Sequence, residues 1–399
     1  MDFSLTDEQN ELVKTMRAVL SRHATSAAVR SAADSEFGFD SGLWRVLTEE
    51  VGVASLAIPE EYGGAGVGWF ETGLALEALG YCLAPSPLLA SAVLAAAAVL
   101  ESGDEEAKQR LLPGIAEGST IATLAWADGR GAWSTSGSGI TASAADAAGS
   151  PGGNDAAEGW TLTGTATLVL DGGSADTLIA VAATPGGVGL FEVLDAGSVQ
   201  RVSTPAVDTT LNFTTMTFAG VPARALLLDA SAALEKIRDI ALVAVSCLQV
   251  GTAQRGLDMS VEYSKQRVQF GRPIGSFQAL KHRMADMLLQ VETARTTAWA
   301  AAWSAGTDAE DLPERAAAAA AWCSDALDHV ASETVQLHGG IAITWEHDAQ
   351  LVFKRAHATG QLFGQAREHR RRLGALLGII PQPAGDGSVE RLDRVPATR

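Results

Sequence analysis

An arginine and a pair of glycines give this chain its clearest capacity for chemistry, which is holding a phosphate-rich ligand. Arg267 ends a long helical pattern just before Phe270, and Gln336 precedes Gly339 and Gly340 about 70 residues later. A planar guanidinium can hold a pyrophosphate through paired hydrogen bonds, and glycines let a backbone approach a phosphate or a ring closely. Either motif alone is usually a helix end. Together, at this separation, they indicate a site for a phosphate-bearing cofactor.

The order of several short motifs resembles the acyl-CoA dehydrogenase family over residues 1 to about 380. The motifs that carry the resemblance are, in chain order, Phe3-Ser-Leu-Thr6, Ile58-Pro-Glu-Glu-Tyr62-Gly63-Gly64, Glu77-Ala-Leu79-Gly80, Arg267-Val-Gln-Phe270-Gly271, Ala285-Asp286-Met287 and Gln336-Leu-His-Gly339-Gly340. The resemblance implies an FAD-dependent oxidoreductase of lipid metabolism that desaturates an acyl-CoA thioester between its α- and β-carbons. In that reaction a carboxylate removes the α-proton, and flavin N5 accepts the β-hydrogen as hydride.

The resemblance also implies the partners of such an enzyme. These are an acyl-CoA substrate, an electron-transfer acceptor, and a related subunit in a homo- or heterotetramer. In the family, each FAD lies mainly on one subunit and is also held by its neighbour, so the oligomer is part of the site. The residues expected to bind FAD in this chain are Arg267, Phe270, Gln278, Gln336, Gly339 and Gly340.

The position at which the family usually carries its catalytic glutamate is Phe363 in this chain, and phenylalanine cannot take a proton. Some members carry the glutamate on an earlier helix, where this chain has Ala241, with Leu248 two turns along the same face. The nearest carboxylates are those of Asp239 and Glu368. Both are candidates for a relocated base, although a solvated charge is the commoner role of such residues. The catalytic base is therefore unknown from the sequence.

The segments expected to hold the flavin ring also depart from the family pattern. A strand end that usually reads like Thr-Glu-Pro is Ala125-Trp126-Ala127 here, Leu170 replaces a threonine beside flavin N5, and Leu211 replaces an arginine. Each change removes a polar contact. We therefore hypothesise that the chain resembles the base-lacking subunits of heteromeric actinobacterial-type acyl-CoA dehydrogenases. It would help to hold a partner's FAD, and the partner would supply the base.

Three alternatives stay open on the same fold. A homo-oligomeric acyl-CoA dehydrogenase with a relocated base would use Asp239 or Glu368. A flavin-dependent monooxygenase would need no base for an α-proton. A non-catalytic acyl-CoA binder would need no flavin chemistry at all. A fold does not by itself decide among these functions.

The elements that must position these residues follow from the hydrophobic pattern. Residues 1–120 are predicted to be helical, with a capping box at Thr6 and Gln9. Short β-prone runs separated by turns fill residues 121–228, apart from a loop rich in Gly, Ser, Ala and Asp over 129–158. Helical patterns return over residues 229–380, before a tail at 381–399. The fold class is therefore α+β, and the resemblance implies a helical N-terminal domain, a middle β-barrel and a C-terminal four-helix bundle.

Composition excludes several classes of protein. The 399 residues are 47% hydrophobic and carry a formal net charge of −18, so neither nucleic acid nor an anionic membrane surface is an expected partner. The three cysteines have no disulfide or metal-ligand spacing. The acidic N-terminus does not resemble a signal peptide, and the longest apolar run, Leu88 to Leu100, is too short for a transmembrane helix. We expect a cytoplasmic protein without a metal site.

Overall fold

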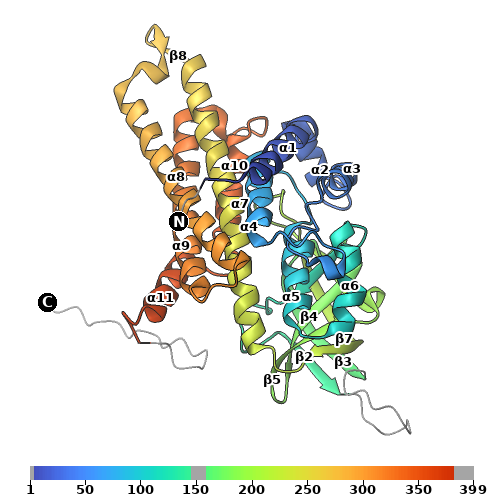
Figure 1. The fold of residues 1–399 in the computed structure, drawn as a ribbon. Coiled ribbons are helices and arrows are strands. Elements are labelled where there is room, and N and C mark those ends of the chain that lie inside the picture. Colours follow the sequence, from blue (N-terminus) through green and yellow to red (C-terminus); the bar gives the residue numbers. More distant parts are fainter. Residues whose placement is uncertain (1–3, 145–158, 382–399) are drawn as a thin grey trace, which may run out of the picture.

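A computed structural model describes residues 4–144 and 159–381, and these form three successive parts (Figure 1). Helices come first in the chain, a β-sheet region follows, and a second group of helices completes the fold. The predicted α+β class and its order of parts are confirmed. The domain boundaries near residues 120 and 228 stay predictions. The predicted tail lies outside the described residues except for Pro381.

The α-helices of the N-terminal part are α1 (Asp7–His23), α2 (Ser26–Ala33), α3 (Ser41–Arg45), α4 (Trp69–Cys82), α5 (Ala96–Glu101) and α6 (Glu105–Glu117). One of them, α4, packs directly on the backbone of the C-terminal part. The predicted capping box is present, because the Gln9 amide donates to Thr6 Oγ1 at 3.2 Å and the Thr6 amide donates to Gln9 Oε1 at 2.9 Å. A Cβ atom on Gly80 of α4 would lie 2.1 Å from the Leu248 carbonyl oxygen. Glycine is required there because the two helix backbones touch.

The middle part is a seven-stranded sheet that closes on itself. Its strands are β1 (Ala122–Ala125), β2 (Ile140–Ala144), β3 (Trp160–Leu170), β4 (Thr177–Thr184), β5 (Gly187–Val193), β6 (Gln200–Thr204) and β7 (Phe213–Leu227). The strand order is β1-β4-β2-β3-β7-β5, β6 pairs with β7, and β5 also pairs with β4. The β4–β5 pairing closes a ring of β4, β2, β3, β7 and β5, so the predicted β-barrel is formed, with β1 paired beside β4.

Two strands differ from the sequence prediction. The strand β2 lies within the stretch 129–158 that was predicted to be a loop, and β6 was not predicted at all. Both have five residues, and only Ile140 and Ala142 of β2 are buried, so their β-signal is weak. Residues 145–158 of the predicted loop lie outside the described residues.

The C-terminal part consists of three long helices and two short ones. They are α7 (Ser231–Gln266), α8 (Gln278–Gly306), α9 (Leu312–His338), α10 (Ala349–Thr359) and α11 (Ala366–Leu376). The long helices α7, α8 and α9 pack on one another, and α10 and α11 pack on α9. The helix α7 is long and apolar enough to cross a membrane, but 89% of its most apolar window is buried inside the fold. Such burial is typical of a core helix.

A buried ion pair attaches α10 to the barrel region. The Arg355 side chain is 1% exposed, and its Nε donates to Asp208 Oδ2 at 2.6 Å. Asp208 is 0% exposed and also accepts a hydrogen bond from the Thr210 amide at 2.9 Å. Because α10 leads directly into the loop that holds Phe363, this ion pair fixes the position of that loop.

Candidate functional site

The Arg267 motif lies at the tip of a projecting arm. Figure 1 shows that α7 and α8 extend beyond the other helices and are joined at their far end by a two-stranded hairpin, β8 (Val268–Gln269) and β9 (Arg272–Pro273). The hairpin turns at Phe270 and Gly271, whose φ angles are 52° and 79°. The Phe270 side chain is 92% exposed. This apolar ring at the end of an arm is suited to contact with another molecule.

The Gln336 motif ends α9 next to the same arm. A ring stack connects the two motifs, with the centroids of Tyr263 on α7 and His338 on α9 at 4.5 Å and an interplanar angle of 29°. The His338 Nδ1 lies 2.7 Å from the Thr334 carbonyl oxygen, and burial lowers the pKa of His338. The His338 ring is buried and packs on Tyr263. The stack itself was not predicted, because Tyr263 and His338 belong to separate helices.

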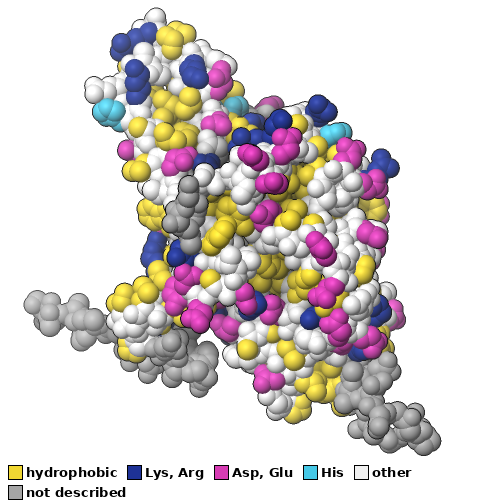
Figure 2. Space-filling model, viewed as in Figure 1, with side chains coloured by type: hydrophobic (Ala, Val, Ile, Leu, Met, Phe, Trp, Pro, Cys, Tyr) yellow, Lys and Arg dark blue, Asp and Glu magenta, His cyan; other side chains and the backbone are white. Residues whose placement is uncertain are grey.

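The exposed residues of the arm fit an anionic cofactor. Among the described residues, no carboxylate forms an ion pair with Arg267. Figure 2 shows Lys and Arg side chains gathered at the tip of the arm, whereas Asp and Glu cover much of the remaining visible surface. A Cβ atom on Gly271, Gly339 or Gly340 would meet nothing within 4 Å. The backbone at these glycines is therefore accessible, and the unpaired Arg267 guanidinium lies on the same arm as Gly271.

The six expected cofactor-binding residues form two groups. Arg267, Phe270 and Gln278 are all exposed on the arm, and the Gln278 amide nitrogen lies 3.4 Å from His282 Nε2. Gln336, Gly339 and Gly340 are exposed at the end of α9. A role for these residues in FAD binding stays a prediction.

The expected position of the base is filled by an aromatic cluster. Phe363, in the loop between α10 and α11, is 6% exposed and has a positive φ of 58°. Its ring centroid lies 6.1 Å from that of Trp126 and 5.1 Å from that of Trp133. Trp126 follows β1, at the strand end that the resemblance assigns to the flavin ring. Three aromatic rings thus pack where the family resemblance places a carboxylate and a flavin.

The surroundings of this aromatic cluster are apolar. Leu170, Ala241 and Leu248 are buried in the same hydrophobic core as Phe363, and no carboxylate replaces any of them. The residues that the structure describes here pack on one another as a core does. They do not fit a bound flavin ring, which needs an open cavity with polar contacts.

The two carboxylates that the sequence offered as relocated bases have other partners. Asp239 on α7 is buried and receives both terminal nitrogens of Arg372 from α11, one of them at 3.0 Å. Burial raises the pKa of Asp239, and this ion pair opposes the shift. Glu368 is exposed and accepts a hydrogen bond from the Gln365 amide at 3.0 Å, in the capping box that begins α11. Both side chains therefore have a structural role.

Asp171 is a buried carboxyl next to Leu170, and we expect it to make stability fall as the pH rises. Its side chain is 5% exposed, its closest polar partner is Asn212 Nδ2 at 3.4 Å, and burial raises its pKa to about 7. The unfolded chain releases this proton near pH 4. Between these two pKa values the folded chain keeps a proton that the unfolded chain loses, so the free energy of unfolding decreases as pH rises.

The variant Asp171→Asn lacks this titration. Relative to the unchanged chain, its free energy of unfolding should increase by about 2–4 kcal/mol between about pH 4 and about pH 8. Urea unfolding of both chains at the two pH values measures this difference. The same difference at both pH values would show that the carboxyl does not titrate in this range.

Comparisons with known proteins agree with this arrangement of parts. Residues 6–119 match the acyl-CoA dehydrogenase N-terminal domain, and residues 239–377 match the acyl-CoA dehydrogenase C-terminal domain. The chain is 38% identical over 375 residues to acyl-CoA dehydrogenase IpdE2 of Mycolicibacterium smegmatis, and the match covers 93% of this chain and 99% of that relative.

Two solved structures resemble the fold closely. A variant of the steroid ACAD Tcur3481-Tcur3483 is 33% identical with a TM-score of 0.82, over 94% of this chain and 98% of that one. A chain of the ChsE4-ChsE5 complex from Mycobacterium tuberculosis is 30% identical with a TM-score of 0.83, over 96% of this chain and 100% of that one. Both names join two different proteins.

Proposed function

This chain belongs to the acyl-CoA dehydrogenase family, and we propose that it is one subunit of a heteromeric enzyme whose related partner supplies the catalytic base and the contacts to the flavin ring. FAD is the cofactor of the family, and when bound it supplies the acceptor for a hydride. The observation that carries the proposal is the packing of Phe363 between Trp126 and Trp133. In this core an aromatic side chain stands where a carboxylate base is expected, and its ring packs against two tryptophans.

The chain's own contribution comes from the arm. Arg267 would hold a phosphate group of the partner's FAD through charge-assisted hydrogen bonds. Gly339 and Gly340 would let the backbone lie close to the cofactor, since a Cβ atom built on either glycine has no neighbouring atom within 4 Å. The amides of Gln278 and Gln336 would orient its polar groups. These residues bind and position the cofactor, and a proton-transfer step is left to the partner.

The related proteins support a mixed assembly and suggest a first substrate to test. Two structurally similar chains come from proteins whose names join two different members, and one of these is called a steroid ACAD. We infer an assembly with a related subunit, an acyl-CoA substrate and an electron-transfer acceptor. A steroid-sized acyl group is the first substrate class to assay.

A homo-oligomeric enzyme with a relocated base is the second candidate, because Asp239 is a buried carboxyl with a raised pKa. The two candidates predict different results for Asp239→Asn and Glu368→Gln in the assembled enzyme. We expect both variants to keep turnover within about twofold, since neither residue would transfer a proton. Reduction of an electron acceptor by an acyl-CoA measures turnover.

The relocated-base alternative requires a much larger effect. Loss of a general base usually lowers the rate by about 100-fold or more. A decrease of that size in Asp239→Asn, with an unchanged flavin content and melting temperature, would favour the homo-oligomeric enzyme. Arg283→Gln is a matched control. This variant also loses a two-point ion pair, which Arg283 near the start of α8 forms with Glu333 on α9, whereas Asp239 lies near the start of α7.

A further inference from the structure

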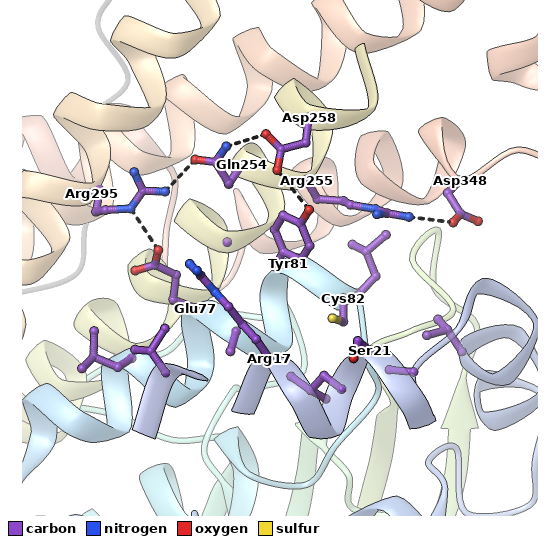
Figure 3. A pocket seen from close by; sticks show the side chains of 18 of the residues that line it. Arg17, Ser21, Glu77, Tyr81, Cys82, Gln254, Arg255, Asp258, Arg295 and Asp348 are labelled. Carbon is purple, nitrogen blue, oxygen red and sulfur yellow. Dashed lines mark hydrogen bonds and ion pairs between the residues drawn. The ribbon is translucent and has the colours of Figure 1, made fainter. Parts of the chain in front are cut away.

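A second cavity lies under the N-terminal helix. It is a cleft of about 870 Å³ lined by residues of α1, α2, α4, α7, α8 and α10 (Figure 3). None of Trp126, Trp133 and Phe363 lines it, so it is separate from the aromatic cluster. Its volume lies within the range of small-molecule sites in proteins, which is about 300–1,000 Å³.

Part of the lining of the cleft is apolar. Leu5, Val13 of α1 and Trp299 of α8 line it, and each of these side chains is partly exposed. A ligand with an apolar body would remove the exposed part of this lining from water, which favours binding.

Another part of the lining is a continuous polar network. Arg295 donates to Glu77 at 3.0 Å and to Gln254 at 2.7 Å, and Gln254 donates to Asp258 at 2.8 Å. The Tyr81 hydroxyl also donates to Asp258, at 3.0 Å. Each charge in this chain of contacts has a partner, so the wall is held in place before any ligand arrives.

The far end of the polar wall is paired as well. The Asp348 carboxylate forms ion pairs with the guanidinium groups of Arg255 and Arg30, with N···O distances of 3.4 Å and 2.9 Å. The Arg255 guanidinium also lies over the Tyr81 ring, 5.7 Å from its centroid. These cations are therefore already neutralised by the protein.

Arg17 is the exception. Its side chain extends from α1 toward the centre of the cleft in Figure 3. Within residues 4–144 and 159–381 it has no carboxylate at ion-pair distance. In a chain with a net charge of −18, an unpaired cation at an amphipathic cleft is suited to an anion. Glu77, Asp258 and Asp348 line the same cleft and would repel a dianion.

We propose that this cleft binds an amphipathic monoanion, which is an apolar body with one terminal carboxylate. The apolar body contacts the partly exposed apolar lining of Leu5, Val13 and Trp299, and the carboxylate contacts Arg17. The site does not rest on the proposed function, because neither FAD nor a partner subunit contributes to it. Linear fatty acids and polycyclic acids share this chemistry, and separate probes distinguish them.

Isothermal titration calorimetry of the full chain tests the proposal, with dodecanoate as the linear probe and cholate as the polycyclic one, each below its critical micelle concentration. We expect at least one probe to bind, and Arg17→Glu to weaken that binding about tenfold or more. Lys14→Glu is the matched control, because Lys14 lies on the same helix, pairs with Glu11 at 3.1 Å and does not line the cleft.

Two further measurements make the test decisive. Ser21→Trp places a large ring at the rim of the cleft from an exposed position, and it should abolish binding without changing the melting temperature. Dodecanol, which has no charge, should bind at least tenfold more weakly than dodecanoate. The proposal is overturned if neither acid binds, if Arg17→Glu and Lys14→Glu have equal affinities, or if dodecanol binds as well as dodecanoate.

Discussion

Replacing Arg267 with alanine is expected to lower the affinity of the assembled enzyme for FAD by about 10- to 100-fold. A hydrogen bond to a charged group contributes about 1.5–3 kcal/mol, and Arg267 can make two to a phosphate from its exposed position on the arm. Flavin fluorescence during titration of the FAD-depleted complex gives the dissociation constant. The loss should grow smaller at high salt, because an exposed ion contact is screened.

A neighbouring lysine provides the control for this prediction. Lys265 is also exposed at the end of α7, but it lies 3.7 Å from Glu262 and is already paired. Lys265→Ala removes the same charge from the arm and should change the FAD affinity by less than about threefold. Equal losses in the two variants would mean that general charge, and not the Arg267 contact, attracts the cofactor.

Replacing Arg355 with methionine is expected to lower the free energy of unfolding by about 3–5 kcal/mol. The substitution removes the ion pair at 2.6 Å and leaves the Asp208 carboxylate buried without its cation. Urea or thermal unfolding of the chain measures the change. Adding Asp208→Asn to the variant should recover part of the loss, because the remaining partner is then uncharged.

An exposed ion pair serves as the comparison. Lys14 and Glu11 form a contact at 3.1 Å with most of both side chains in solvent, so Lys14→Met should change stability by less than about 1 kcal/mol. If Arg355→Met also lowered the free energy of unfolding by less than about 1 kcal/mol, the buried pair would not hold α10 on the barrel.

The fold was predictable because its strongest signals are long. The helices α7, α8 and α9 each have 27 residues or more, and apolar residues recurring over such lengths give a strong helical signal. The strands β2 and β6 were missed because five residues with few buried positions carry little signal. Thr6 and Gln9 specify the start of α1 locally, so that helix start was predictable from four residues.

The site was predictable only in part. The sequence identified Phe363 as the place of a missing base. Its packing with Trp126 was not predictable, because Trp126 follows the first strand of the barrel and Phe363 lies far along the chain, after α10. Such a contact depends on tertiary structure, and neither residue indicates it locally. The Arg355–Asp208 pair was missed for the same reason, and because charged residues are seldom buried. The cleft beside Arg17 is lined by residues of six helices, and no motif marks it.

The absorbance spectrum of the purified protein tests the central claim most directly. It should be recorded for this chain alone and for the chain produced together with a related acyl-CoA dehydrogenase subunit. We expect the visible flavin band to appear only in the co-purified complex, and acyl-CoA-dependent reduction of an electron acceptor to accompany it. Full flavin occupancy and turnover in the chain alone would contradict the claim that its own flavin position is filled by Phe363, Trp126 and Trp133.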